Sequence, residues 1–115
     1  MIYPDWWGMP PAILKGWIDR VFRPGFAYEF EGEEFTEKEK VPLLTGKRAM
    51  VVTTTNETNP LSQEAMNTLW RERVFGYTGI GQVDFRCFYG LRESSGRERR
   101  RWMDELCKIL ERWAA

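Results

Sequence analysis

Two short segments of the chain carry residue types that suit the binding of a flat, polar ligand. The first is Pro4-Asp5-Trp6-Trp7-Gly8, in which two adjacent indoles could stack on a heteroaromatic ring. Gly8 has no side chain, so backbone N–H groups beside it could approach a ligand closely. The two tryptophans also suit a structural role, with one indole packed in the core and the other covering the start of the next helix.

The second segment, residues 53–59, offers four threonine hydroxyls and free backbone N–H groups just ahead of a predicted helix. A helix N-terminus attracts anionic or electron-rich oxygen atoms because its first N–H groups have no partner within the helix. The alternative is that these residues only cap the helix.

The other reactive residue types give weaker signals. Histidine is absent, which removes the commonest general base and the commonest metal ligand, and we expect no metal site. Cys87 and Cys107 form no Cys-x-x-Cys pair, so we expect reduced thiols, with Cys87 buried and inert in an apolar strand. Four arginines within residues 97–101 fall in the first turns of a predicted helix, where cations oppose the helix dipole, and we interpret them as a solvated face.

Chain length, net charge and the length of the apolar runs limit the class of protein. The 115 residues correspond to one domain, and 17 basic side chains balance 17 acidic ones, so net charge gives no reason to expect nucleic-acid binding. We expect no membrane span, since no apolar run approaches the roughly 18 residues required. With no leader-like start, the sequence predicts a cytoplasmic protein.

Strands and helices alternate along the chain, as judged from the spacing of the apolar residues. The sequence predicts a short strand at 1–3, a loop at 4–11 and a helix from Pro11 to about Phe22. Residues 26–30 form either a short strand or an ordered loop, and residues 31–40 a flexible charged excursion. A strand at 48–55, a helix that begins at Pro60 and ends at Gly76 and Gly79, a strand at 83–89 and a last helix capped by Ser95 and Glu98 follow. This order predicts a parallel sheet in an α/β fold. Ligands bind beyond the carboxyl ends of such strands, where both candidate segments lie.

The string from Pro4 to Val21, PDWWGMPPAILKGWIDRV, closely resembles the signature of the flavodoxin-like NAD(P)H dehydrogenase (quinone) family. The continuation from Pro24 to Phe30, the Leu44-Thr45-Gly46-Lys47 segment and the final Arg-x-x-Trp helix resemble that family too. The resemblance covers essentially the whole chain and corresponds to the C-terminal half of the family's fold, with about three strands and three helices. It implies a single partial domain at 1–115 that lacks the family's N-terminal phosphate-binding loop.

The resemblance implies an FMN-dependent reductase that takes a hydride from NAD(P)H and reduces a quinone-like acceptor, FAD being the less expected cofactor. The implied cofactor-binding residues lie in the two loops: Pro4, Asp5, Trp6, Trp7, Gly8, Thr54, Thr55, Asn56 and Glu57. No catalytic residue is assigned, since the tyrosine and histidine that assist hydride transfer in some members have no counterpart. The resemblance also implies a homodimer.

Two departures leave alternatives open. The family has glycines where this chain has Asn56 and Glu57, and a carboxylate that pointed inward there would disfavour a reduced anionic ring. Without the phosphate-binding half, the chain could instead be a non-catalytic remnant that serves as a structural or interaction module. A third alternative is an aromatic-lined binder of some other flat ligand.

Overall fold

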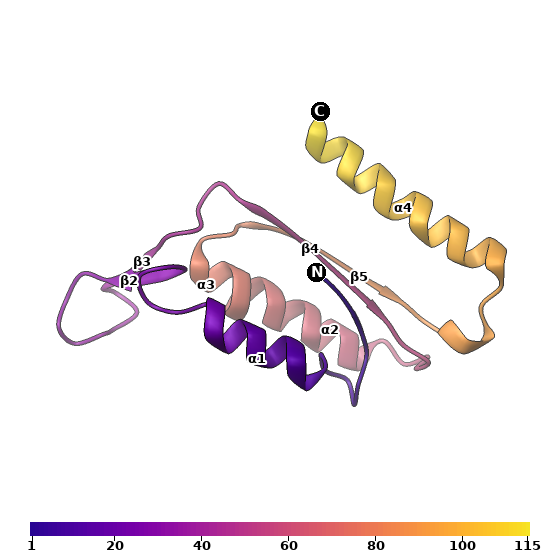
Figure 1. Cartoon of the computed structure of the whole chain (residues 1–115), viewed down its shortest axis with the longest axis horizontal. Coiled ribbons are helices and arrows are strands. Elements are labelled where there is room, and N and C mark those ends of the chain that lie inside the picture. The colour runs from indigo at the N-terminus through magenta and orange to yellow at the C-terminus, as the bar shows by residue number, and fades with distance from the viewer.

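The computed structural model describes residues 1–115 and contains a parallel three-stranded sheet with helices on both faces (Figure 1). The strands lie in the order β1 (Ile2–Pro4), β4 (Arg48–Thr54) and β5 (Gln82–Phe88). Val51 and Val52 in the central strand are both buried and serve opposite faces of the sheet, which explains the continuous apolar run. The predicted flavodoxin-like parallel arrangement is confirmed.

One face of the sheet is covered by α1 (Ala12–Val21) and by the helix that follows β4 (Figure 1). The main core lies beneath these helices and consists of eight buried residues: Tyr3, Ala49, Val51, Met66, Trp70, Phe75, Ile80 and Val83. The first helix begins at Ala12, one residue later than predicted, and Pro11 stands at its N-cap with an extended backbone (ψ of 152°).

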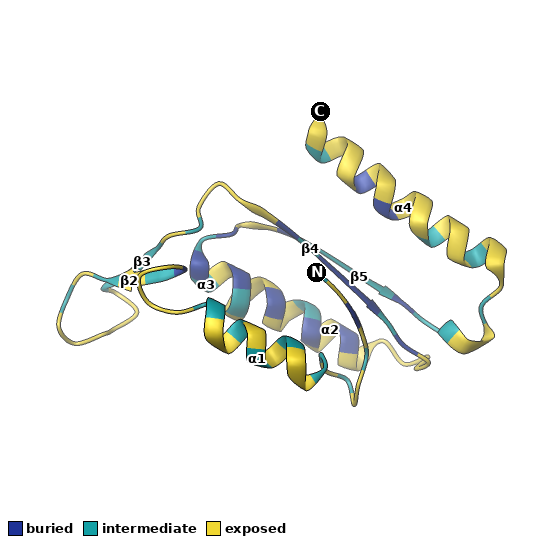
Figure 2. Cartoon of the chain, in the orientation of Figure 1, coloured by how far each residue is buried: buried dark blue, intermediate teal, exposed yellow.

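The opposite face is covered by α4 (Gly96–Ala114), which begins with the predicted capping box of Ser95 and Glu98. Its core is small: Leu106 packs with Val52 and Phe88, and the Trp102 ring stacks on Phe88 at 4.9 Å. Most of this helix is exposed (Figure 2). Met103 and Leu110 are exposed on this helix, which lies over a sheet only three strands wide.

The helix after β4 differs from the prediction. It runs through α2 (Leu61–Thr68), the π-helix η1 (Leu69–Phe75) and α3 (Gly76–Thr78), and it ends at Gly79 in the left-handed conformation. Gly76 was expected to end the helix but lies inside it, where its N–H donates to the Arg71 carbonyl. A side chain at position 76 would collide with that same carbonyl oxygen, so the wide π-turn requires glycine here.

A second, two-stranded sheet was predicted only in its first strand, at 26–30. β2 (Tyr28–Phe30) pairs antiparallel with β3 (Lys40–Pro42), which the sequence analysis missed because a proline is unfavourable in most strands. Tyr77 anchors this hairpin to α3: its ring lies edge-on to Tyr28 at 5.1 Å and beneath the Lys40 ammonium at 3.6 Å. The charged segment 31–39 forms the loop of the hairpin and projects from the body (Figure 1).

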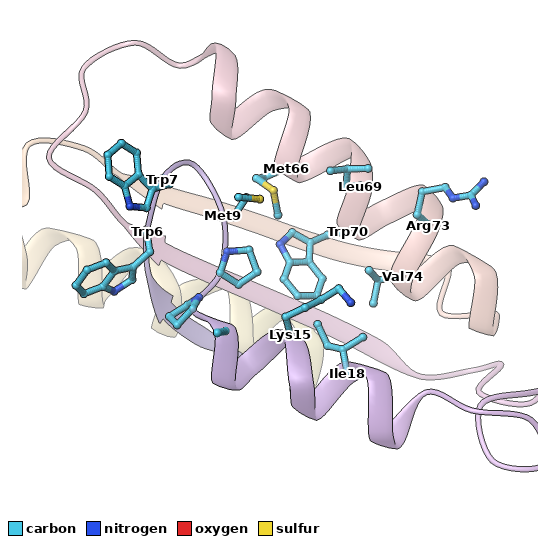
Figure 3. Close-up of a pocket in the computed structure, with 13 residues that line it drawn as sticks. Trp6, Trp7, Met9, Lys15, Ile18, Met66, Leu69, Trp70, Arg73 and Val74 are labelled. Atoms are coloured by element: carbon cyan, nitrogen blue, oxygen red, sulfur yellow. The ribbon is translucent and has the colours of Figure 1, made fainter.

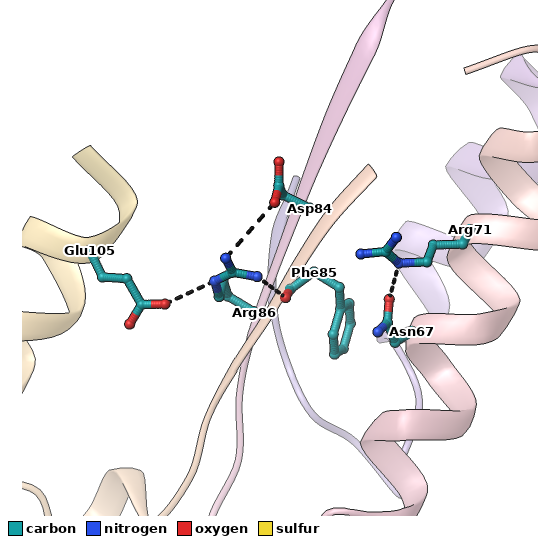
Figure 4. A network of polar contacts seen from close by, with 6 residues as sticks. All are labelled: Asn67, Arg71, Asp84, Phe85, Arg86 and Glu105. Atoms are coloured by element: carbon teal, nitrogen blue, oxygen red, sulfur yellow. Dashed lines mark hydrogen bonds and ion pairs between the residues drawn. The ribbon is translucent and has the colours of Figure 1, made fainter. Parts of the chain in front are cut away.

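Polar contacts on the surface connect the layers (Figure 4). Arg86 Nε on β5 donates to Glu105 Oε1 on α4 at 2.8 Å, and the Asp84 carboxylate lies 3.9 Å from the same guanidinium. Across the junction of α2 and η1, Arg71 Nε donates to Asn67 Oδ1 at 2.8 Å. Exposed ion pairs of this kind stabilise by about 0.2–1 kcal/mol, so packing of the core dominates. None of the helices combines the length and the apolar character of a membrane span.

Candidate functional site

The two candidate loops are bonded to each other at the carboxyl edge of the sheet. The Asp5 N–H donates to the Thr54 carbonyl at 2.8 Å, and the Thr55 hydroxyl donates to Asp5 Oδ2 at 2.8 Å. The Thr55 N–H in turn donates to the Phe88 carbonyl at 3.0 Å, which fixes the second loop to β5. The juxtaposition expected from the parallel topology is therefore present, because β1 and β4 end side by side.

A tight turn presents the two tryptophans. The N–H of Trp6 donates to the Met9 carbonyl at 2.9 Å and the N–H of Met9 donates back at 3.1 Å. Trp7 and Gly8 occupy the two central positions with φ of 59° and 77°, a left-handed conformation that a bulky residue rarely adopts. Their own N–H groups donate to no group of the chain. Such strain in an exposed loop is typical of a functional position.

Neither indole is part of the core, so the structural role considered for the pair is wrong. Trp7 is 94% exposed and Trp6 is 61% exposed. The turn lifts both rings away from the sheet, since the left-handed backbone at Trp7 reverses the chain before the helix begins.

A polar hollow with a volume of about 730 Å³ separates this turn from the start of α2. Its lining consists of Asp5, Trp7, Gly8, Thr55, Asn56, Glu57, Thr58, Asn59, Leu61 and Ser62. The loop is held by its own side chains: Thr55 accepts from the Glu57 N–H at 3.0 Å, and Asn59 accepts from the Leu61 N–H at 3.0 Å. The capping role considered for this loop is thus confirmed for Asn59, while the rest of the loop faces the hollow.

The structure brings six of the nine predicted cofactor-binding residues to this hollow: Asp5, Trp7, Gly8, Thr55, Asn56 and Glu57. The other three do not line it. Pro4 and Thr54 are paired with each other in the sheet, and Trp6 lies at the neighbouring groove. Asn56 is also engaged through its side chain, which accepts from the Arg92 N–H at 2.8 Å.

The charge of the hollow is negative. Asp5 and Glu57 are the only acidic side chains in its lining, and no lysine or arginine lines it. The helix dipole at the start of α2 supplies roughly half a positive charge, which is smaller than two carboxylates. The arginines at 97, 99, 100 and 101 lie exposed on α4, as predicted, and Arg99 is bound to Ser94 and to the Leu91 carbonyl. The hollow therefore suits a neutral ring with N–H or O–H groups better than an anion.

An apolar groove of about 660 Å³ lies on the other side of the Trp6–Met9 turn, between α1 and the α2–η1 helix (Figure 3). Trp6, Trp7 and Met9 stand at one end, and Trp70 forms part of its wall. The sequence analysis did not single out Trp70 as a site residue. Trp70 lies in the π-helix η1, which no local sequence pattern predicted.

Trp70 also connects the groove to the sheet. Its Nε1 donates to the Tyr3 hydroxyl at 3.0 Å, and its indole stacks on Phe75 at 5.6 Å. Burial raises the pKa of the Tyr3 hydroxyl, so the phenol remains a neutral hydrogen-bond acceptor here.

Cys87, on β5 beside Thr53, is only half-buried, yet burial raises the pKa of its thiol to about 11. This supports the expectation of an inert thiol. No group of three cysteine, aspartate or glutamate side chains converges in a way that could hold a metal ion.

The hollow fits the ring system of a flavin better than its phosphate. Asp5 lies in the lining, and its carboxylate oxygens are acceptors for a ring N–H. Trp7 offers an exposed aromatic face beside two free N–H groups. A phosphate would meet two carboxylates and no cation.

Comparison with known proteins agrees with this architecture. A family described as having a flavodoxin-like fold matches residues 1–111. An FMN-dependent NADH:quinone oxidoreductase of Cereibacter sphaeroides is 40% identical over 92 residues, which cover 76% of this chain and 44% of the relative. An uncharacterized NAD(P)H oxidoreductase of Haemophilus influenzae is 36% identical over 93 residues, with the same coverage.

The crystal structure of a putative quinone reductase from Klebsiella pneumoniae superimposes with a TM-score of 0.80 at 26% identity, covering 96% of this chain and 47% of that one. This chain thus spans less than half the length of these three relatives. The match over residues 1–111, together with the order of strands and helices, shows that the chain belongs to the family with the flavodoxin-like fold.

Proposed function

We propose that this chain provides the ring-binding side of an FMN-dependent NAD(P)H:quinone oxidoreductase. The observation that carries the proposal is the bond between Thr55 and Asp5, which joins two loops around one polar hollow beneath an exposed tryptophan. The relatives named as FMN-dependent NADH:quinone oxidoreductases support the choice of FMN over FAD and of NADH as one donor.

The residues of the chain act by binding and orienting the ring. Trp7 stacks against it, and the N–H groups of Trp7 and Gly8 donate to its electron-rich edge. Asp5 accepts from a ring N–H, and the Asn56–Glu57 segment closes the far side of the hollow. When bound, FMN would supply the hydride and electron transfer between NAD(P)H and a quinone. Pro4 and Thr54 act indirectly by fixing the strand ends.

The direct test is reconstitution with FMN. The proposal expects flavin to accumulate on the protein side in equilibrium dialysis at high protein concentration, and expects NADH to bleach the bound flavin until a quinone is added. Failure to retain flavin at any concentration would favour the second candidate function, an interaction module.

The second candidate is favoured by one observation, the apolar side chains exposed along α1 and the groove. Ile13 is 85% exposed and Trp17 is 47% exposed, although soluble monomers rarely expose such patches. We propose that a second copy of the chain covers this face, giving a homodimer. This assembly is compatible with either function.

Light scattering at micromolar concentration tests the dimer. Ile13→Asp together with Trp17→Ser would yield a folded monomer. A wild-type chain that stays monomeric at all concentrations would contradict the assembly. We also assign the protein to the cytoplasm, supported by its two free thiols, which are typical of a reducing compartment.

A further inference from the structure

Beneath the candidate site, the side chains between the sheet and α2 change from apolar to polar. The change occurs on β4, β1 and α2 as each approaches the carboxyl edge of the sheet. On β4 the side chains that face α2 are Val51, Thr53 and Thr55 in order toward the carboxyl end. On β1, Tyr3 is followed by Asp5, and Asp5 is bonded to Thr55. The buried stripe of the helix above runs Trp70, Met66, Gln63 toward its N-terminus. A polar layer therefore lies between the sheet and α2, directly below the Trp6–Met9 turn.

Gln63 is the least expected member of this layer. It is 2% exposed, and neither its Nε2 nor its Oε1 has a hydrogen-bond partner within the chain. Leaving a buried amide unpaired costs more free energy than an ordinary hydrogen bond gains. A leucine or methionine would continue the stripe of Met66 and Trp70 without that cost, so an amide at this position points to a partner outside the protein's own polar groups.

Two other groups of the layer have the same need. Asp5 Oδ1 is buried without a partner, although its other oxygen accepts from Thr55. The Thr53 hydroxyl is fully buried and lies near the Tyr3 phenol, but it forms no hydrogen bond of good geometry. Together these residues offer a carboxylate oxygen, an amide oxygen, an amide NH₂ and a hydroxyl.

These groups supply the donors and acceptors that one buried water molecule would need. A buried water typically makes about three hydrogen bonds to otherwise unpaired polar groups. It can donate to Asp5 Oδ1 and to Gln63 Oε1 while accepting from the Thr53 hydroxyl or from a Gln63 NH₂ of favourable geometry. Direct contact is not the explanation, because no hydrogen bond joins Gln63 to Asp5.

We propose that Gln63 is a positioning residue, which holds the Asp5 carboxylate at the floor of the polar hollow through an internal water shared with Thr53. Asp5 is then fixed at both oxygens, by Thr55 and by the water. The N–H groups of Trp7 and Gly8 above it remain free for a ligand. This assignment does not depend on the identity of that ligand.

Gln63→Met tests the proposal because methionine has a similar volume and no hydrogen-bonding amide. Loss of the water-mediated contacts should lower the folding equilibrium constant at least tenfold in chemical denaturation. Gln82→Met is the matched control, because it makes the same exchange at an exposed position. It should change the folding equilibrium constant less than twofold. A Gln63→Met protein as stable as the wild type, or more stable, would overturn the proposal, since an amide without a partner is relieved by an apolar replacement.

Two further readouts separate positioning from packing. The side-chain carboxyl ¹³C resonance of Asp5 should move in Gln63→Met but stay in place in Met66→Leu, which alters the same helix face one turn away. Combining Gln63→Met with Asp5→Asn should give less than the sum of the two losses, and strict additivity would contradict a shared water. Should Gln63→Met not fold, the wild-type protein still decides the matter: the Gln63 side-chain NH₂ must show a nuclear Overhauser effect to a long-lived water. Its absence would disprove the site.

Discussion

The Thr55 hydroxyl lies 2.8 Å from Asp5 Oδ2 and donates to it, across 50 residues of sequence. This bond closes the gap between the end of β1 and the end of β4, and both residues line the polar hollow. Because the acceptor is a carboxylate oxygen, the bond belongs to the stronger class of hydrogen bonds.

Replacing Thr55 by valine should therefore weaken both the fold and the site. We expect a loss of about 1.5–3 kcal/mol in the free energy of unfolding, since the change removes a donor to a charged group. Thr54→Val makes the same exchange at the neighbouring position, whose side chain does not line the hollow, and should cost less. If urea denaturation gives the same loss of unfolding free energy for Thr55→Val and Thr54→Val, the bond between Thr55 and Asp5 makes no specific contribution to stability.

The two tryptophans should differ in their effect on ligand affinity. Trp7 lines the polar hollow, whereas Trp6 lines only the apolar groove. Stacking of a base on an aromatic side chain contributes about 1–3 kcal/mol, so Trp7→Ala should weaken flavin binding by roughly tenfold or more. Trp6→Ala should have the smaller effect. Unchanged affinity in both variants, measured by flavin fluorescence, would exclude the turn from the site.

Gly76 should tolerate no side chain. In Gly76→Ala the new Cβ would collide with the Arg71 carbonyl oxygen, and we expect a loss of about 1–3 kcal/mol through forced backbone shifts. Gly16→Ala is the control, since a Cβ at that position in α1 meets nothing within 4 Å. It should instead stabilise the helix by about 0.5–1 kcal/mol. If Gly76→Ala were as stable as wild type in thermal unfolding, the π-turn would not depend on glycine.

The two cysteines should react at different pH. Cys107 is exposed, whereas burial raises the pKa of Cys87 to about 11. Only the thiolate is nucleophilic, so at pH 8 Cys87 is almost wholly protonated and should resist alkylation while Cys107 is modified. The alkylation rate of Cys87 should rise as the pH approaches 11. Mass spectrometry after timed alkylation, with Cys107→Ser as control, measures this directly, and rapid labelling of Cys87 at pH 8 would contradict the burial of its thiol.

The sequence was sufficient for the elements whose signals are local. Pro11 and Pro60 mark helix starts, Ser95 and Glu98 form a capping box, and the β-branched run at 48–54 forms the central strand. The meeting of the two loops also followed from topology, because parallel strands end at one edge.

The features that depend on packing could not be predicted in this way. Gly76 reads locally as a helix terminator, and only the approach of the Arg71 carbonyl shows why it lies within a π-helix. Gln63 looks like an ordinary polar residue near a helix start, and its burial appears only when α2 is placed on the sheet. The exposure of Trp7 results from two successive left-handed residues, a conformation that a tryptophan does not favour.

The most direct test of the proposed ring-binding site compares FMN with riboflavin by fluorescence titration of the chain. The hollow fits the ring and offers no cation to the phosphate, whose charge-assisted bonds would each add about 1.5–3 kcal/mol where a phosphate site exists. We therefore expect both ligands to bind weakly and with similar dissociation constants, and we expect Asp5→Asn and Trp7→Ala to weaken both alike. Tight binding that is selective for FMN, or ring binding that neither substitution alters, would contradict the account.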